Sequence, residues 1–210
     1  MTGKFAIVTG ASSGIGLSLA KELAARGYDL AISSAGDRLT TAAEELQGIG
    51  ARVIAIQQDL ATRDGVEQFW KEVRSLGRDV DVACLNAGVG VGGLFAETEL
   101  DAELNMVNLN CTGTVHPAKH VVQHMVQRGR GNILFTASIA GEMVAPREAV
   151  YAATKAFVLS LAHSIRYELR DFRRINHCST AWSDRHRFFP SRWDGQHASG
   201  FRRKIREPAG

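Results

Sequence analysis

The chain has 210 residues, 45% of them hydrophobic and 22% charged, which is enough for one sizeable core and too little for two comfortable domains. Its 21 glycines and only 4 prolines exclude collagen-like and proline-rich disordered classes, and its three cysteines show no paired spacing typical of disulfide frameworks or zinc sites. No apolar run reaches the roughly 20 residues of a membrane span, and a first strand after four residues leaves no room for a signal peptide. We therefore expect a reduced, cytoplasmic protein without a membrane partner.

The net charge of +3 is unevenly distributed along the chain. Residues 1–172 contain 16 Lys and Arg against 19 Asp and Glu, whereas residues 173–210 contain 9 against 3. Basic tails often bind nucleic acid. This one has no recognisable binding module and no helical or strand periodicity, so we expect no nucleic-acid partner.

Apolar strands alternate with amphipathic helices in chain order. The first apolar run ends in glycine, as a strand buried on both faces of a parallel sheet does, and a helical period follows it. The pattern predicts strands over 4–9, 28–33, 52–57, 81–85 and 132–136, and helices over 15–24, 37–47, 63–76, 100–127 and 149–172. This alternation indicates an α/β fold with a doubly wound parallel sheet, helices on both faces and right-handed crossovers.

A glycine-rich turn joins the first strand to the first helix. Gly10, Gly14 and Gly16 give the spacing G-x-x-x-G-x-G. Such glycines let the backbone approach a pyrophosphate, whose charge is then held by free N–H groups at a helix N-terminus. Ser12 and Ser13 add hydroxyl donors beside them. A plain tight turn is the alternative, but the position between a buried strand and an amphipathic helix favours dinucleotide binding.

Polar residues also follow the third and fourth strands. Asp59 and the turn Asn86-Ala87-Gly88 are expected at the C-terminal edge of the sheet, where ligands of open α/β sheets bind. Taken singly, each is as well explained by a helix N-cap or an ordinary turn. Their joint arrangement favours a ligand site.

Tyr151 and Lys155 stand four residues apart at the start of a predicted helix, so both side chains project from one helix face. An unperturbed tyrosine has a pKa of about 10, and a nearby ammonium lowers it by favouring the phenolate. Ser138, which ends the preceding strand, is placed to hydrogen-bond a substrate oxygen. Asn110, within the long helix, is a candidate for holding a proton-relay water. A solvated Tyr–Lys pair is the alternative.

These motifs together resemble the short-chain dehydrogenase/reductase family over residues 1–172. The resemblance implies a Rossmann-like sheet and an NAD(P)-dependent transfer of hydride between nicotinamide and an alcohol or carbonyl. It also implies an acid/base role for Tyr151, with Lys155 lowering its pKa and binding the nicotinamide ribose. Ser138 would orient the substrate oxygen, and Asn110 would support the relay. The motifs are TGASSGIG (Thr9, Gly10, Ser12, Ser13, Gly14, Ile15 and Gly16), Asp59 with Leu60, Asn86-Ala87-Gly88, Asn110, Ser138, and YAATK from Tyr151 to Lys155.

The choice between NAD and NADP depends on the end of the second strand. Ser33 and Ser34 stand there, so an acidic partner for a ribose 2′-hydroxyl is missing. Arg38, several residues on, could meet a 2′-phosphate or simply be a solvent-exposed arginine. The sequence favours NADP slightly.

His116, His120 and His124 recur every four residues and mark one face of the long predicted helix. This spacing could bind a metal, but no carboxylate or cysteine in the sequence pattern completes the set. In the resembling family this helix contacts a partner subunit, so we interpret the histidines as interface or surface residues and expect no metal. Cys111 is interpreted as a packing residue, because no basic neighbour or helix start lowers its pKa. The resemblance also implies a homo-oligomer in an intact form.

The resemblance stops after Phe172, where the family carries further strands and a helix that covers the substrate. No apolar strand is evident from Arg173 onward, so we expect the C-terminal strands to be missing, a disordered basic tail over 173–210, and an impaired enzyme. A shifted reading frame would explain this. Trp182 has the single codon TGG, and the codons of the serine that follows it begin with T or A, so reading from the second base of the Trp182 codon gives a glycine codon. That glycine falls where the family has its Pro-Gly turn. A divergent basic tail is the alternative. The competing function is a catalytically silent dinucleotide-binding protein.

Overall fold

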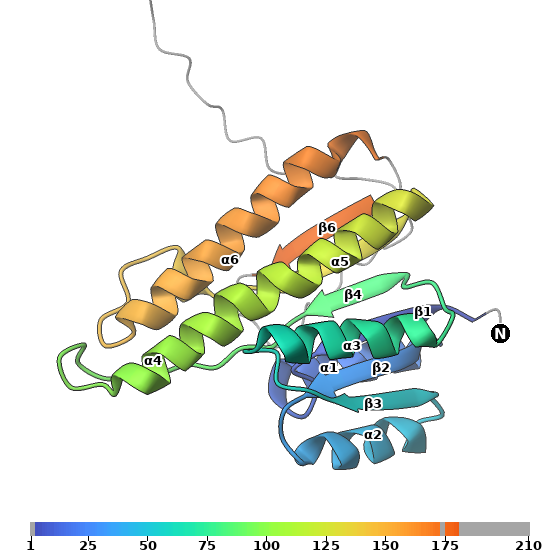
Figure 1. Ribbon diagram of the computed structural model, residues 1–210, viewed down its shortest axis with the longest axis horizontal. Coiled ribbons are helices and arrows are strands. Elements are labelled where there is room, and N and C mark those ends of the chain that lie inside the picture. Colours follow the sequence, from blue (N-terminus) through green and yellow to red (C-terminus); the bar gives the residue numbers. More distant parts are fainter. Residues whose placement is uncertain (1–2, 173–174, 181–210) are drawn as a thin grey trace, which may run out of the picture.

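The computed structural model describes residues 3–172 and 175–180, and its centre is one parallel sheet with the strand order β3-β2-β1-β4-β5-β6 (Figure 1). Each strand pairs in parallel with its neighbours, which requires a crossover between successive strands. The strands are β1 (Phe5–Thr9), β2 (Asp29–Ser34), β3 (Val53–Gln57), β4 (Val82–Leu85), β5 (Gly131–Thr136) and β6 (Ile175–Thr180).

Helices provide these crossovers and cover both faces of the sheet. Thr62 caps the third helix by accepting a hydrogen bond from the backbone N–H of Gly65, and Gly129 ends the fifth in the left-handed conformation that glycine tolerates. The helices are α1 (Gly14–Ala25), α2 (Arg38–Gly48), α3 (Arg63–Ser75), α4 (Leu100–Val107), α5 (Gly113–Arg128) and α6 (Ala149–Glu168).

Alternate residues of the central strands enter two separate cores. Val8 and the strand residues on its face of the sheet pack against α1 and α2, whereas Ile7 and those on the opposite face pack against α3, α5 and α6. Because side chains of a strand point alternately to opposite faces, a strand buried on both sides is a continuous apolar run. The run Phe5–Val8 is fully buried for this reason.

The elements expected from the sequence are confirmed to within a few residues, with one difference in the long helix. The stretch expected as a single helix over 100–127 contains a π-helical segment, Asn108–Thr112, between α4 and α5. Such wider turns are rare and frequently lie at functional sites. Here the segment contains Asn110, so the local widening positions a residue expected in the site.

The expectation of no strand after Phe172 is wrong for residues 175–180. These residues form β6, which pairs with β5 from Gly131↔Ile175 to Thr136↔Thr180, so the sheet extends past the domain boundary expected at 172. Strand pairing is made by backbone groups, which an apolarity criterion does not detect. The rest of the expected basic tail, residues 181–210, lies outside the described part, and the frame shift proposed for residues 173–210 stays untested.

The order of the strands reverses between β1 and β4. The chain leaves β1 through α1 toward β2 and returns through α3 to β4 on the other side. Ligands of open α/β sheets bind at the C-terminal strand ends beside such a reversal. None of the described helices is long and apolar enough to cross a membrane.

We predict that Ile175→Ala lowers the free energy of unfolding by about 2–5 kcal/mol, as deletion of a buried isoleucine side chain does. Ile175 is 7% exposed and belongs to the core beneath α6. Urea denaturation measures the effect. Ile49→Ala is the matched control, because Ile49 is 55% exposed, and we expect a change within about 0.5 kcal/mol. Equal effects of the two substitutions would show that β6 is not part of the folded core.

Candidate active site

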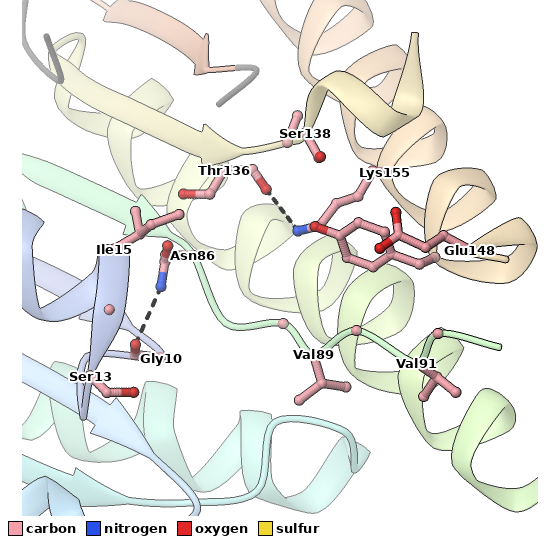
Figure 2. Close-up of a pocket in the computed structure, with 16 residues that line it drawn as sticks. Gly10, Ser13, Ile15, Asn86, Val89, Val91, Thr136, Ser138, Glu148 and Lys155 are labelled. Atoms are coloured by element: carbon pink, nitrogen blue, oxygen red, sulfur yellow. Dashed lines mark hydrogen bonds between the residues drawn. The ribbon is translucent and has the colours of Figure 1, made fainter. Parts of the chain in front are cut away.

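A cleft of about 560 Å³ opens at the C-terminal ends of β1, β4 and β5 (Figure 2). This volume falls in the range of small-molecule and cofactor sites. The segments that follow the three strands line one side, and the start of α6 lines the other. The lining residues are Gly10, Ser13, Gly14, Ile15, Asn86, Gly88, Val89, Gly90, Val91, Gly92, Thr136, Ala137, Ser138, Glu148, Tyr151 and Lys155.

The glycine-rich turn forms the end of the cleft beside α1. Gly10 has φ +66°, and a Cβ on Gly16 would clash with the Gly10 carbonyl oxygen, so both positions require glycine. Gly14 has φ +57°, and a Cβ there would meet no atom within 4 Å, so its backbone faces open space. The first turn of α1 therefore has room to present its N–H groups to the cleft, at the place where the sequence predicts a pyrophosphate.

Thr9 joins the end of β1 to the turn after β4. Its buried hydroxyl donates to the Cys84 carbonyl (3.4 Å) and accepts from the N–H groups of Asn86 (2.9 Å) and Ala87 (3.0 Å). The Asn86 side-chain amide in turn donates to the carbonyls of Thr9 and Gly10. These bonds hold the two turns together at the strand-order reversal. Thr9 and Ala87 thus support the cleft and do not line it.

Lys155 is 6% exposed, and its ammonium donates to the backbone carbonyl of Thr136 at 3.1 Å (Figure 2). Burial lowers the pKa of Lys155, because removal from water disfavours the charged form. Its Nζ lies 5.7 Å from the centre of the Tyr151 ring. The two side chains therefore meet in the cleft as their four-residue spacing predicts.

Ser138 lines the cleft beside Lys155 and caps a short 3₁₀ helix, Ile139–Gly141, that packs against α6 (Figure 2). Its Oγ accepts a hydrogen bond from the Ala140 N–H at 3.2 Å. That contact uses a lone pair and leaves the hydroxyl proton available to donate. The loop after β4 also lies against Tyr151, since a Cβ on Gly90 would be in ordinary van der Waals contact with the ring at 3.5 Å.

Asn110 is buried behind the cleft and connects three segments. Its side-chain amide donates to the Val89 carbonyl and to the Thr154 hydroxyl, both at 2.9 Å, and its Oδ1 accepts from the Val89 N–H at 2.9 Å. Thr154 passes the connection on by donating to the Tyr151 carbonyl at 2.8 Å. Asn110 thus positions the loop after β4 relative to the helix that carries Tyr151.

Six residues expected in the cofactor site do not line the cleft: Thr9, Gly16 and Ala87, which support it, and Ser12, Asp59 and Leu60. Asp59 is exposed at the end of β3, where its carboxylate accepts from the Ala61 N–H. Leu60 is buried in the core, and the Ser12 hydroxyl accepts a hydrogen bond from Ser34 at 3.0 Å. Asp59 is not the cap of α3 either, because Thr62 has that position.

The structure adds residues that the sequence analysis missed. Thr136 supplies the carbonyl that holds Lys155, Thr154 links Asn110 to Tyr151, and Glu148 places a carboxylate at the mouth of the cleft (Figure 2). The loop from Val89 to Gly92 lines the side opposite Ser138. Its four-residue run of valine and glycine directly after the turn at Asn86 is the signal that could have indicated a close backbone approach.

The histidine stripe gains the carboxylate that the sequence pattern lacked. Glu67 of α3 lies beside His116 and His120 of α5, so the statement that no carboxylate completes the set is wrong in three dimensions. Cys111 lies near Lys155, and burial raises the pKa of its thiol. A raised thiol pKa agrees with its interpretation as a packing residue.

Comparison with known proteins identifies relatives that match most of the described chain. A family model described as short chain dehydrogenase matches residues 4–181. The 3-oxoacyl-(acyl-carrier-protein) reductase FabG of Staphylococcus epidermidis is 36% identical over 168 residues, which are 79% of this chain and 69% of that protein. Oxidoreductase UcpA of Salmonella typhimurium is 32% identical over 170 residues, 80% of this chain and 64% of that protein.

Solved structures show the same fold. A short-chain dehydrogenase/reductase from Burkholderia phymatum in complex with NAD superposes with a TM-score of 0.79 at 28% identity, covering 84% of this chain and 64% of that one. A metagenomic short-chain oxidoreductase in complex with NADP gives a TM-score of 0.80 at 26% identity, covering 86% and 82%. This chain therefore spans about two thirds of the length of several relatives that it matches.

We predict that Thr9→Val lowers the free energy of unfolding by about 1–3 kcal/mol, because the N–H groups of Asn86 and Ala87 lose a buried acceptor without a change in volume. Urea denaturation measures the effect. Thr41→Val, on the exposed side of α2, is the control and should change stability by less than about 0.5 kcal/mol. A Thr9 variant as stable as this control contradicts the proposed support of the cleft.

We also predict that Lys155→Met raises the unfolding free energy at neutral pH. Because the folded pKa of Lys155 lies below its ordinary value of 10.5, the native protein carries a costly buried charge at low and neutral pH. Between the lowered pKa and 10.5 only the unfolded chain keeps the proton, so the stability of the wild-type protein rises with pH there.

The stability advantage of Lys155→Met should therefore shrink as the pH rises through that window. Thermal melting at a series of pH values measures it, and Lys119→Met, on the exposed side of α5, is the matched control. A Lys155 variant less stable than the wild type at neutral pH would show that the bond to Thr136 outweighs the cost of burial.

Proposed function

Because this chain belongs to the short-chain dehydrogenase family, we propose that it is an NAD(P)-dependent oxidoreductase acting on an alcohol or a carbonyl compound. The observation that carries the proposal is the convergence of Tyr151, Lys155 and Ser138 in the cleft that the glycine-rich turn closes. Two separate segments, α6 and the turn after β5, bring these side chains together beside the glycine-rich turn, which a solvated Tyr–Lys pair would not require.

The cleft fits a dinucleotide at its glycine end. The backbone at Gly14 is open, whereas a Cβ at Gly10 or Gly16 would clash with neighbouring backbone, so the turn keeps its close packing only with glycine at those two positions. Ser13, Gly14 and Ile15 would hold the pyrophosphate, Asn86 and Gly88 would flank the path to the nicotinamide, and Lys155 would bind its ribose. When bound, the nicotinamide supplies or accepts the hydride.

The protein's own chemistry is the movement of a proton at the substrate oxygen. Tyr151 donates that proton in the direction of carbonyl reduction and accepts it in the direction of alcohol oxidation. The ammonium of Lys155, held by Thr136, favours the phenolate form. Ser138 directs its free hydroxyl proton to the same oxygen.

Asn110 acts in this mechanism as a positioning residue. Its side-chain hydrogen bonds reach Val89 and Thr154, and through Thr154 the backbone of Tyr151. Support of a proton-relay water by this residue remains a proposal alongside that positioning role.

Either nicotinamide cofactor is compatible with the family, and we propose a slight preference for NADP. Ser33 and Ser34 end β2 without an acidic partner for a ribose diol. Asp37, the nearest acid along the chain, accepts a hydrogen bond from Gln57 instead. Arg38 begins α2, exposed to solvent, where a 2′-phosphate could pair with it.

The substrate side of the cleft is open. Val144 is 89% exposed and Phe95 is 68% exposed on the segments that flank Tyr151, which favours a substrate with an apolar body. The same exposure favours the second candidate function, a dinucleotide-binding protein without turnover, because the substrate would bind with little cover. We further propose a cytoplasmic location and assembly with copies of the chain.

We predict that Tyr151→Phe lowers turnover about a hundredfold or more and leaves cofactor affinity nearly unchanged, because the ring remains and only the proton donor is lost. Oxidation of NADPH and NADH over a panel of ketones measures turnover, and fluorescence titration measures cofactor binding. Tyr167→Phe is the control, since Tyr167 is 67% exposed and far along α6.

Two results would contradict the proposal. Undiminished reduction by the Tyr151 variant removes the phenol from the chemistry. Tight cofactor binding by the wild-type protein with no turnover on any ketone selects the silent dinucleotide-binding protein.

A further inference from the structure

Helix α5 packs against α3 on the side of the sheet that also carries α6 (Figure 1). Each of its three histidines contacts a residue of α3. His116 and His120 are partly buried, and Glu67 of α3 lies beside them. His124, one turn further on, contacts Arg74 and the N–H of Val80 instead. The first two histidines and Glu67 therefore form a cluster of their own, which we call the α3–α5 cluster.

The ligand atoms of the α3–α5 cluster converge on one point. The Nε2 atoms of His116 and His120 lie 2.7 and 3.4 Å from the same Oε1 of Glu67, and all three atoms lie within 4.8 Å of one another. Bonds of about 2.0–2.1 Å at tetrahedral angles place zinc ligands about 3.3 Å apart. The atoms of the set lie within 4.8 Å of one another, so small rotations of the histidine and Glu67 side chains would bring them to that spacing.

His120 carries a buried ring nitrogen without a hydrogen-bond partner among the described residues. Its Nε2 is shielded from solvent, and its contact with Glu67 does not meet hydrogen-bond geometry. The ring is held in place by Trp70, which stacks on it at 5.4 Å between ring centres and 8° between planes. A metal site needs ligand atoms that are held in place and free of other hydrogen bonds before the ion binds. The His120 Nε2, fixed beside the Glu67 carboxylate, is such an atom.

We propose that Glu67, His116 and His120 bind a Zn²⁺ ion that links α3 to α5. Two imidazoles and one carboxylate form a common zinc ligand set, with water as the fourth ligand. Imidazole nitrogen disfavours Mg²⁺ and Ca²⁺, which prefer oxygen ligands. None of the three residues lines the cleft, so the ion would stabilise the packing of two helices and leave the redox chemistry unchanged.

The protonation states required for zinc binding are accessible near neutral pH. The hydrogen bond with His116 lowers the pKa of Glu67, so its carboxylate is ionised. Each imidazole must be neutral with its proton on Nδ1, which frees Nε2 for the ion. Zinc therefore competes with protons for the two imidazoles, and its binding should weaken as the pH falls.

Titration calorimetry with Zn²⁺ on the full chain, without a polyhistidine tag, tests the proposal. We expect one site, and affinity lowered about tenfold or more in both Glu67→Gln and His116→Ala. Glu67 is exposed, so its variant should remain folded and keep the test valid. His163→Ala, on α6, is the matched histidine control and should bind as the wild type does.

Two further measurements do not depend on turnover. Zn²⁺ at about a hundred times its dissociation constant should raise the melting temperature by about 5 to 10 °C in the wild type and not in Glu67→Gln. Co²⁺ should give the visible absorption of a tetrahedral site and quench the fluorescence of Trp70, and Trp70→Phe should identify that signal.

Equal zinc affinity in the wild type and in both cluster variants would overturn the proposal, because other residues, including His186 and His197, would then hold the ion. Binding weaker than about 1 mM would also overturn it. A third result would overturn it as well: a His116 variant that is less stable in the absence of zinc, together with a wild-type melting temperature that zinc does not change. The cluster would then be a hydrogen-bonded contact only.

Discussion

The junction between β1 and β4 is the constraint on which the site depends. The chain leaves β1 toward one side of the sheet and β4 toward the other, so the turns that follow these two strands diverge. The Thr9 hydroxyl connects the two turns by accepting hydrogen bonds from the N–H groups of Asn86 and Ala87. Its single proton and both lone pairs are used, so the contact is satisfied without water. The Gly10 backbone can then approach the turn after β4, because a Cβ at Gly10 would lie 2.7 Å from the Ala87 Cα. The open cradle at Gly14 follows from this close approach.

A second set of contacts places the reactive side chains against that cradle. Lys155 reaches the carbonyl of Thr136 at the end of β5, and Asn110 ties the loop after β4 to the helix of Tyr151. Both contacts have a cost: the ammonium is buried, and the long helix widens into a π-helical segment at Asn110. Strained or poorly solvated groups of this kind cluster at functional sites because the surrounding fold holds them in place. Burial of apolar side chains in the two cores on the faces of the sheet offsets these costs.

The α3–α5 cluster lies apart from the cleft and is held by contacts of its own between two helices. Its members come from helices whose apolar faces already pack on the sheet, so Glu67 and the histidines add polar contacts at the rim of an existing core. The Nε2 of His120 is buried and has no hydrogen-bond partner among the described residues. A bound ion would stabilise the folded protein there, because it would replace the hydrogen bond that this nitrogen lacks. The same cluster without metal is a carboxylate and two imidazoles between adjacent helices.

The amino-acid pattern predicts most elements up to residue 172, the glycine-rich turn and the Tyr151–Lys155 pair. Each of these depends on residues a few positions apart, whose spacing gives a period, a turn or a shared helix face. The tertiary structure alone decided which distant groups meet them: Thr136 below Lys155, Val89 against Asn110, and Glu67 beside His116, 49 residues away. It also decided that residues 175–180 form a strand. Backbone pairing with β5 places these residues in the sheet, and their composition does not indicate a strand. Local patterns are encoded in neighbouring residues, whereas these contacts exist only once the crossovers have brought separate strands and helices together.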